Sequence, residues 1–259
     1  MRWVSLFLPF FLFSAPIGNP FMPGMLREEL FSLIKIPIHV RVGYEGNFVF
    51  DRYLDQYQTG FGSLEKYEIY TNSGRISCDI FDRISLFGTA GSGRIDANFP
   101  FSSGPLKHRA VLGSDEELFW SVGGNVLLLD WRLFALGIGL CYSRLCPKIS
   151  HLSVDGVGYP TEDGSLHYRE WQANVGFSYE MDFLVPYIGV KYTSAKSTAH
   201  LPYIPDLFVG ESQERFWRSR RHVGLYLGSS ITSKKSFALT IEARLIDEEA
   251  VTVFAAFRF

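Results

Sequence analysis

The sequence has few cysteines, no excess of charge and no long apolar run beyond its first residues. Its 259 residues include three cysteines, which are too few, and odd in number, for a disulfide scaffold. The formal net charge of −2 argues against a nucleic-acid partner, and no polybasic run is available for binding a membrane surface. After residue 14, no apolar segment is long enough to cross a bilayer as a helix. The length leaves room for one large barrel or two small domains.

Signals for catalysis and for cofactors are also lacking. The glycine-rich run at residues 88–93 is not followed by the Gly-Lys-Ser/Thr of a phosphate loop, and no metal-ligand spacing occurs. Three acids and a histidine are predicted to lie near one rim, namely Asp155, Glu162, Asp163 and His167. Nothing there fixes a nucleophile, a base and an oxyanion donor together. We therefore predict that the protein is not an enzyme and has no catalytic residue, metal or cofactor.

What is present begins with an export signal. Met1-Arg2 is a short basic start, and the apolar run from Trp3 to Phe13 is too short to span a bilayer. We predict a signal peptide at residues 1–14, cleaved after Ser14. Residues 15–37 then form an N-terminal segment in the periplasm or in a lumen. Its apolar residues between 25 and 36 have helical spacing, which fits a short helix or a plain linker equally.

The last residues of the chain alternate between two faces, as a β-strand does. One set is Val251, Val253, Ala255, Phe257 and Phe259, and the other is Thr252, Phe254, Ala256 and Arg258. An end on an aromatic residue after such a strand is typical of Gram-negative outer-membrane β-barrels, with Phe257 and Phe259 as the assembly signal. In water this apolar edge would aggregate, whereas a closed barrel in lipid has no edge. The soluble alternative is the last strand of a β-sandwich.

The same alternation recurs in segments of the length that a tilted transmembrane strand needs, about ten residues. The predicted strands are 38–54, 64–81, 84–94, 116–129, 132–146, 167–180, 184–196, 214–230, 235–245 and 249–259. Short polar turns are predicted at 82–83, 129–130, 181–182 and 233–235, and longer irregular loops near 55–63, 95–115, 147–166 and 197–213. This asymmetry is that of periplasmic turns and external loops, with a short external turn at 246–248 as the exception.

The predicted fold class is therefore all-β: a transmembrane antiparallel up-and-down β-barrel over residues 38–259, with about ten strands. A turn at Asp51-Arg52 would instead give about twelve strands. A soluble β-sandwich or propeller is the rival interpretation of the strand pattern alone.

Projecting the alternation inward predicts a charged lumen. The lumen-facing residues are Arg41, Glu45, Arg75, Asp79, Lys191, Arg220, Glu242, Arg244 and Arg258, six basic and three acidic. Charges inside a barrel in lipid must be paired or hydrated. Either they lock into ion pairs that fill a narrow, structural or adhesive barrel, or water fills the lumen and small solutes pass. A hydrated lumen with this basic excess predicts mild anion selectivity, although about eight strands already give a filled interior.

Several blocks, in order along the chain, resemble the chlamydial major outer membrane protein, a family of cysteine-rich porins. The blocks are residues 17–20, 41–52, 80–91, 170–173, 186–191, 243–248 and the C-terminal Phe-Arg-Phe259. The resemblance implies an outer-membrane porin in a Gram-negative bacterium of the chlamydial kind. It implies passive diffusion of small solutes and a structural role in the envelope. The alternative is a non-conducting structural or surface-binding barrel of adhesin type.

The partners implied are outer-membrane lipid, the barrel-assembly machinery and small solutes, with a homo-oligomer as an option and no nucleic acid. The chain is shorter than the family and lacks most of its cysteines. Cys78 is predicted on the lipid face, Cys141 inside and Cys146 at the rim, where it could form one disulfide. The other interpretation, which we favour, is that all three cysteines are small apolar fillers.

Overall fold

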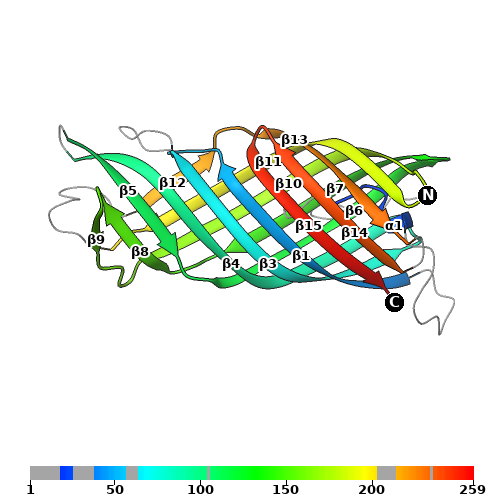
Figure 1. Ribbon diagram of the computed structural model, residues 1–259, viewed down its shortest axis with the longest axis horizontal. Helices are drawn as coiled ribbons and strands as arrows, with labels where there is room; N and C mark the ends of the chain where they lie inside the picture. The colour runs from blue at the N-terminus through cyan, green and yellow to red at the C-terminus, as the bar shows by residue number, and fades with distance from the viewer. Residues whose placement is uncertain (1–17, 26–37, 57–63, 104–105, 203–213, 234–235) are drawn as a thin grey trace, which may run out of the picture.

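The protein is a closed β-barrel of ten antiparallel strands (Figure 1). The computed structural model describes residues 18–25, 38–56, 64–103, 106–202, 214–233 and 236–259. The ring consists of β1 (Ile38–Arg52), β3 (Lys66–Ile80), β4 (Ile84–Ser103), β6 (Glu117–Trp131), β7 (Phe134–Leu145), β10 (Ser165–Tyr179), β11 (Leu184–His200), β13 (Val223–Thr232), β14 (Phe237–Leu245) and β15 (Glu248–Arg258). Pairing of β1 with β15, from Arg41 opposite Arg258 onward, closes it. The predicted ten-strand barrel is confirmed; β1 runs through Asp51 and Arg52, so the twelve-strand alternative is not adopted.

Short turns close the end of the barrel at which residues 18–25 and the C-terminus lie (Figure 1). Phe81 and Asp82 join β3 to β4 with φ of 53° and 52°, the left-handed pair of a tight hairpin turn. The predicted turn at residues 129–130 was wrong, because β6 continues to Trp131 and the turn follows at Arg132. A bulge between Leu127 and Leu129 breaks the alternation there, and the break resembled the end of a strand.

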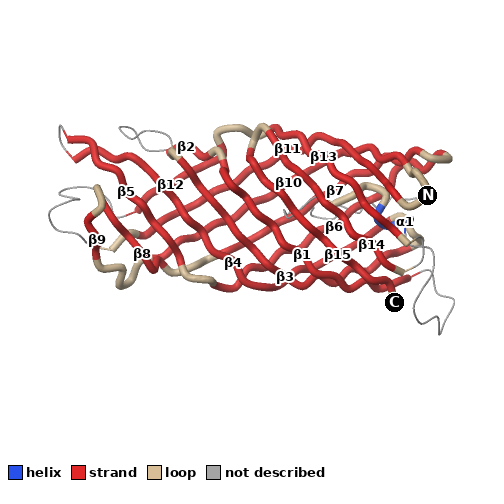
Figure 2. The backbone as a smooth tube through the Cα atoms, viewed as in Figure 1, coloured by secondary structure: helices blue, strands red, loops and turns tan. Residues whose placement is uncertain are grey.

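The opposite end carries further strands where irregular loops were predicted. In the 95–115 and 147–166 regions, β4 extends to Ser103 and is followed by β5 (Leu106–Ser114), β8 (Ile149–Val154) and β9 (Val157–Tyr159), which pair in series (Figure 2). β2 (Leu54–Gln56) pairs with β12 (Glu214–Ser219), so the predicted strand at 214–230 is two strands, separated at residues 220–222. These segments form strands because they extend the hairpins of the ring and pair with one another. The predicted loop residues 57–63 and 203–213 lie outside the described part.

The two ends of the barrel have opposite hydrophobic patterns. Near the short turns, the outward side chains are apolar and exposed, as a wall in contact with hydrocarbon requires; Val42, Ile76, Leu86, Ile138, Val190, Ile241 and Phe257 are examples. At the far end, the apolar side chains point inward and form the largest hydrophobic core, which includes Tyr67, Ile95, Phe99, Leu112 and Trp217. The end opposite the short turns therefore has an apolar interior, as a protein in water does. The end beside the short turns has an apolar exterior, as a barrel in a membrane does.

Two aromatic bands mark the edges of the lipid-facing wall. Trp171 contacts Tyr192 with ring centroids 5.1 Å apart at one level, and Phe134 stacks on Phe177 at 5.3 Å at the other. From Trp171 to Tyr179, eight residues of tilted strand cover roughly 20 Å across the membrane, close to the apolar band of about 25 Å in such barrels. Because outer-membrane barrels have short turns on the periplasmic side and longer loops outside, the short-turn end is the periplasmic end and the long hairpins are external. Within the described residues, no helix has the length and apolarity needed to cross a membrane.

An N-terminal segment, residues 18–25, lies inside the periplasmic end and includes the four-residue helix α1 (Met22–Met25). Phe21, Met22 and Met25 are buried against inward residues of the wall such as Leu127 and Val185. The predicted signal peptide, its cleavage site and nearly all of the predicted 25–36 helix lie outside the described residues.

Candidate functional site: the charged lumen

The first layer of the lumen, nearest the periplasm, is held by two arginine–aspartate pairs. Arg41 Nε lies 2.5 Å from Asp79 Oδ2, and a second nitrogen of Arg41 donates to Asp79 Oδ1 at 2.7 Å and to the Ser85 hydroxyl at 2.9 Å. Arg41 and Asp79 are buried at this bidentate contact, the strongest geometry for the two groups. Arg258 pairs with Asp82 of the β3–β4 turn at 2.9 Å. The layer links β1, β3 and β15 at the seam where the barrel closes.

One level further in, Arg75 of β3 pairs with Glu45 of β1. The Arg75 Nη1 to Glu45 Oε2 distance is 3.0 Å, and both side chains are buried. The guanidinium also lies 3.6 Å from the centre of the Phe87 ring, within cation–π distance. The pair is thus almost fully removed from water and is held between two strands and an aromatic ring.

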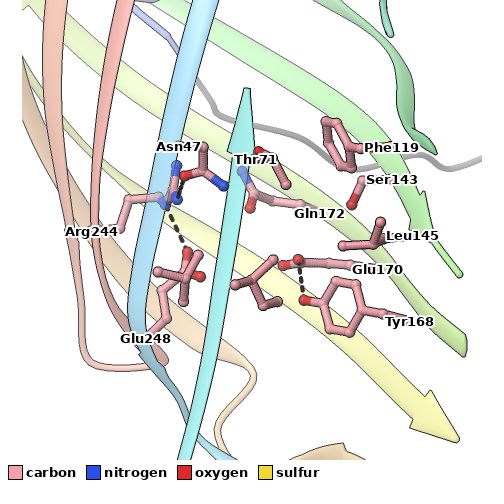
Figure 3. A pocket seen from close by; sticks show the side chains of 12 residues that line it. Asn47, Thr71, Phe119, Ser143, Leu145, Tyr168, Glu170, Gln172, Arg244 and Glu248 are labelled. Atoms are coloured by element: carbon pink, nitrogen blue, oxygen red, sulfur yellow. Dashed lines mark hydrogen bonds and ion pairs between the residues drawn. The ribbon is translucent and has the colours of Figure 1, made fainter. Parts of the chain in front are cut away.

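The central layer is a network of three cations, Arg52, Lys191 and Arg244, and several carboxylates. Figure 3 shows the part of it at Arg244 and Glu248. Glu248 accepts from Arg244 Nε at 2.7 Å, lies 2.9 Å from Arg52 Nη1 and contacts the Lys191 ammonium. Asp247 contacts Lys191 at 2.9 Å and Arg52 at 3.1 Å. The network therefore ties together β1, β11, β14 and β15.

Two more carboxylates extend this network. Glu170 of β10 lies 2.8 Å from Arg52, and its other oxygen accepts from the Tyr168 hydroxyl at 2.5 Å (Figure 3). Glu242 lies 3.4 Å from Arg244 and accepts from the Tyr187 hydroxyl at 3.0 Å. A buried network is tolerable only when each charge is matched in this way, since an unpaired buried ion costs several kcal/mol.

Sequence reasoning missed four members of this network: Arg52, Glu170, Asp247 and Glu248. Asp247 and Glu248 were assigned to an external turn, but that turn folds inward, and Asp247 is fully buried. Ile246 adopts a φ of 83°, which is rare for a β-branched residue and turns the following carboxylates into the lumen. Room for Asp247 exists because residue 224 is glycine; a Cβ there would lie 1.8 Å from Asp247 Oδ1. The buried aspartate therefore depends on the absence of a side chain on a neighbouring strand.

The structure places eight of the nine predicted lumen residues inside the barrel, and Arg220 outside. Arg220 lies in the break between β12 and β13 with its side chain 54% exposed, 3.9 Å from Asp55. The break interrupts the alternation by which Arg220 was assigned inward. Among the residues that the structure describes, the inward basic residues are Arg41, Arg52, Arg75, Lys191, Arg215, Arg244 and Arg258, and the inward acidic residues are Glu45, Asp79, Glu170, Glu242, Asp247 and Glu248. Seven against six replaces the predicted six against three, and the basic excess nearly disappears.

Little open space remains between these side chains. The void beside Arg244 and Glu248, also lined by Asn47, Thr71 and Gln172, measures about 30 Å³, enough for one or two water molecules. A second void, beside Glu45 and Arg75, measures about 10 Å³. The central layers are therefore polar and filled by their own side chains.

The N-terminal segment closes the lumen from the periplasmic side. The Gly18 amide donates to Glu242 at 3.0 Å, so the segment reaches the charged network directly. The buried Asn19 side chain donates to the Val185 carbonyl at 3.0 Å and to the Ser230 hydroxyl at 3.1 Å. Pro20 fits against the wall at Gly176, where a Cβ would meet it at 2.7 Å. The segment thus occupies a site built for it.

On the external side, the hydrophobic core closes the interior. Trp217 is 1% exposed, with its ring centroid 5.4 Å from Phe99 and 6.4 Å from Tyr67. The Tyr67 hydroxyl is hydrogen-bonded to Ser197 at 2.7 Å across the interior. Strands from opposite sides of the barrel therefore meet above the charged layers.

The remaining predicted residues lie apart from the lumen. Phe257 and Phe259 face outward near the periplasmic end, 46% and 43% exposed. Cys78 is half-buried on the outer face, Cys141 is buried and Cys146 is half-buried near the external rim; all three are free thiols. Asp155 binds His108, while His167 lies against His200 and Cys146. Of the predicted rim group, Asp155 and His167 therefore have separate partners. Among the described residues, no group of three potential ligands could hold a metal ion.

Comparison with known proteins agrees with this architecture. The family model described as "Chlamydia major outer membrane protein" matches residues 154–204 and 208–259. A Chlamydia trachomatis major outer membrane porin of serovar D is 25% identical, with 95% of each chain covered, and one from Chlamydia muridarum is 24% identical, with 96% of this chain and 95% of the relative covered. The C. muridarum alignment runs over 385 positions against the 259 residues here, so the relative has segments that this chain lacks.

Solved structures of outer-membrane barrels give more distant matches. An outer-membrane channel from Pseudomonas putida F1 has a TM-score of 0.43 at 9% identity, with 90% of this chain and all of that chain covered. The outer-membrane protease OmpT from Escherichia coli has a TM-score of 0.40 at 12% identity, with 85% and 94% covered.

Ten closed antiparallel strands with an apolar belt outside and ion pairs inside define the class of outer-membrane β-barrels. Within that class, the chain is similar to the Chlamydia major outer membrane protein over residues 154–204 and 208–259, and its place is the outer membrane.

Proposed function

We propose that the protein is a porin-like barrel of low conductance that lets small solutes diffuse passively and that also has a structural role in the envelope. The observation that carries the proposal is the layered set of ion pairs inside a wall that faces lipid. Charges in such a place mark solute and ion pathways in membrane proteins. The related chains named major outer membrane porins support the same function.

Passage in this proposal requires the interior to move. The N-terminal segment and the external core occupy the two ends of the path, and the two voids beside the charged layers have room only for water-sized molecules. We therefore expect small and infrequent openings rather than a steady current. Because seven basic and six acidic residues of the described part of the chain face inward, we expect little preference between anions and cations.

Planar bilayers test the proposal with purified, folded protein. Discrete small steps are expected from the full chain, and more frequent or larger steps from a variant lacking residues 18–25. A synthetic peptide of residues 15–25, added from the periplasmic side, should restore the low activity. Heat-modifiable mobility on a gel checks that both proteins are folded.

A second candidate is a non-conducting structural or surface-binding barrel. The hydrophobic core of the external hairpins favours it, because that core fills the space through which a solute would leave. Silent bilayers from both folded proteins would establish this candidate and reject the porin.

A further inference from the structure

A row of cations crosses the outer face of the barrel just above the external aromatic band. Arg144 of β7 lies opposite Arg169 of β10, and Arg169 lies opposite Lys196 of β11. The row continues to Arg218 of β12 in the same register. Their side chains alternate with buried neighbours and are exposed. Like charges directly opposite one another on adjacent strands destabilise a sheet, so the row calls for a stabilising partner outside the chain.

Within the described part of the chain, no carboxylate forms an ion pair with Arg144, Arg169 or Lys196. Two acids lie at the edge of the face: Asp55 opposite Arg218, and Glu214 at 3.2 Å from His200. Arg221 adds further exposed positive charge beside the row, and Arg220 lies 3.9 Å from Asp55. The face thus has a clear positive excess.

The opposite face of the external end differs. There Lys66 lies 2.6 Å from Glu68, Arg94 lies 3.7 Å from Asp96, and Arg109 lies 2.8 Å from Glu65. Each of these cations therefore has a carboxylate of its own. Arg144, Arg169 and Lys196 differ from them in this respect.

A cleft lies at the start of the row. It has a volume of about 280 Å³ and is lined by Tyr142, Arg144, Cys146, His167, Arg169 and His200. The Arg144 Nε donates to the Cys146 sulfur at 3.2 Å, and the His167 and His200 rings meet edge to face at 5.5 Å. Guanidinium and imidazole groups around one hollow form a site for a phosphate-sized anion.

The position of the cleft relative to the membrane identifies the source of the anion. Tyr142 and Trp171, which lie opposite each other, belong to the aromatic band, and Arg144 and Arg169 lie two residue pairs further out, on the same face. Aromatic bands lie at the level where headgroups begin, so these arginines reach the headgroup layer of the outer leaflet. Anionic headgroups attract cations at that level and at short range.

We propose that Arg144, Arg169 and Lys196 form a binding site for the phosphate groups of an outer-leaflet glycolipid of the lipid A kind, with one phosphate in the Arg144–Arg169 cleft. The lipid supplies the negative charge that the row lacks. Its acyl chains continue along the apolar wall below the aromatic band.

The test compares two matched triple variants of the full chain, folded in detergent. R144Q/R169Q/K196Q removes the row, and K66Q/R94Q/R109Q removes three external cations from the opposite face. Native mass spectrometry with bis-phosphorylated lipid A should show binding at least tenfold weaker for the first variant and within twofold of wild type for the second. Dephosphorylated lipid A should bind both variants and wild type equally weakly. Without lipid, the row variant should melt at a higher temperature than wild type, because the like-charge repulsion is gone.

A second measurement leaves the row intact. Modification of Cys146 in the wild-type protein by a water-soluble maleimide, followed by peptide mass mapping, should slow at least fivefold when phosphorylated lipid A is present. Equal binding by the row variant and wild type, or an unchanged Cys146 rate, would overturn the proposal. Binding of heparin or inorganic phosphate without binding of lipid A would reject the lipid and assign the site to soluble anions.

Discussion

At the scale of single residues, Glu248 holds the central network together. It accepts from Arg52, Lys191 and Arg244, so Glu248→Gln would leave three buried cations with one carboxylate fewer. We expect a loss of about 3–5 kcal/mol in the free energy of unfolding, the usual cost of breaking a buried ion pair. Denaturant titration in detergent, read by gel mobility, measures it.

The neighbouring residue provides the control for that prediction. Glu249 points outward, is exposed and accepts from the Tyr53 hydroxyl at 2.7 Å. Glu249→Gln should change the free energy of unfolding by about 1 kcal/mol or less, as for exposed pairs. Equal effects of the two substitutions would contradict the structural role of the network.

Also at this scale, Trp217 tests the external core. Trp217→Ala removes a ring that is 1% exposed and packed between Phe99 and Tyr67, so we expect a loss of about 3–5 kcal/mol. The external hairpins should then become sensitive to protease while the membrane-facing part stays folded. Protection unchanged from wild type would show that the core does not depend on this side chain.

At the scale of elements, the β8–β9 hairpin depends on one carboxylate. Asp155 and Gly156 form its two-residue turn with φ of 50° and 83°. The Asp155 carboxylate accepts from the Arg109 amide at 2.9 Å and lies 2.7 Å from His108. The Arg109 amide, followed by His108, lowers the pKa of Asp155 from its usual value of 3.8.

The sign of the pH effect follows from that direction. A carboxyl whose pKa is lower in the folded protein stabilises the fold above its unfolded pKa, and the contribution is lost as the pH falls through the folded value. We therefore expect the hydrogen-exchange protection of the Arg109 amide to fall below about pH 4. In Asp155→Ala the protection should be low at every pH; a wild-type protection that is flat down to pH 2 would contradict the prediction.

The strands also show which parts of the fold and of the charged lumen could be predicted from the sequence. Alternation in β1, β3, β11, β14 and β15 predicted these strands of the ring and eight of the inward charges, because a wall between lipid and a polar interior imposes a period of two. The bulge at Leu127–Leu129 and the break at residues 220–222 shifted that period, and they misplaced a turn and Arg220. The inward fold of Asp247 was unpredictable, since it depends on a left-handed Ile246 and on the space at Gly224, which meet only in three dimensions.

At the scale of the whole molecule, the same strands face lipid in one half of the barrel and water in the other. Their apolar side chains therefore point outward in the membrane-facing half and inward in the external half. β3, for example, buries Tyr67 and Ile69 inside its external part and exposes Ile76 to lipid further along. Its inward residues change from apolar to charged between Ile69 and Arg75. The charged layers therefore lie between an apolar core above and the N-terminal segment below, which makes the interior a sealed polar compartment rather than an open pore.

Closure of the whole barrel depends on its last strand. The Phe259 amide donates to the Val40 carbonyl at 2.8 Å, which completes the seam between β15 and β1, and its ring faces outward. Removal of Phe259 should leave the chain exported but unfolded, with most of the heat-modifiable form lost from the outer membrane, because both the seam contact and the terminal aromatic are gone. Phe183→Ser is the matched control, since Phe183 is an outward aromatic, 64% exposed, in a periplasmic turn away from the seam. Normal outer-membrane levels of the truncated chain would refute the assembly role of the C-terminal aromatic, and an equal loss in Phe183→Ser would assign the effect to any lost outward aromatic.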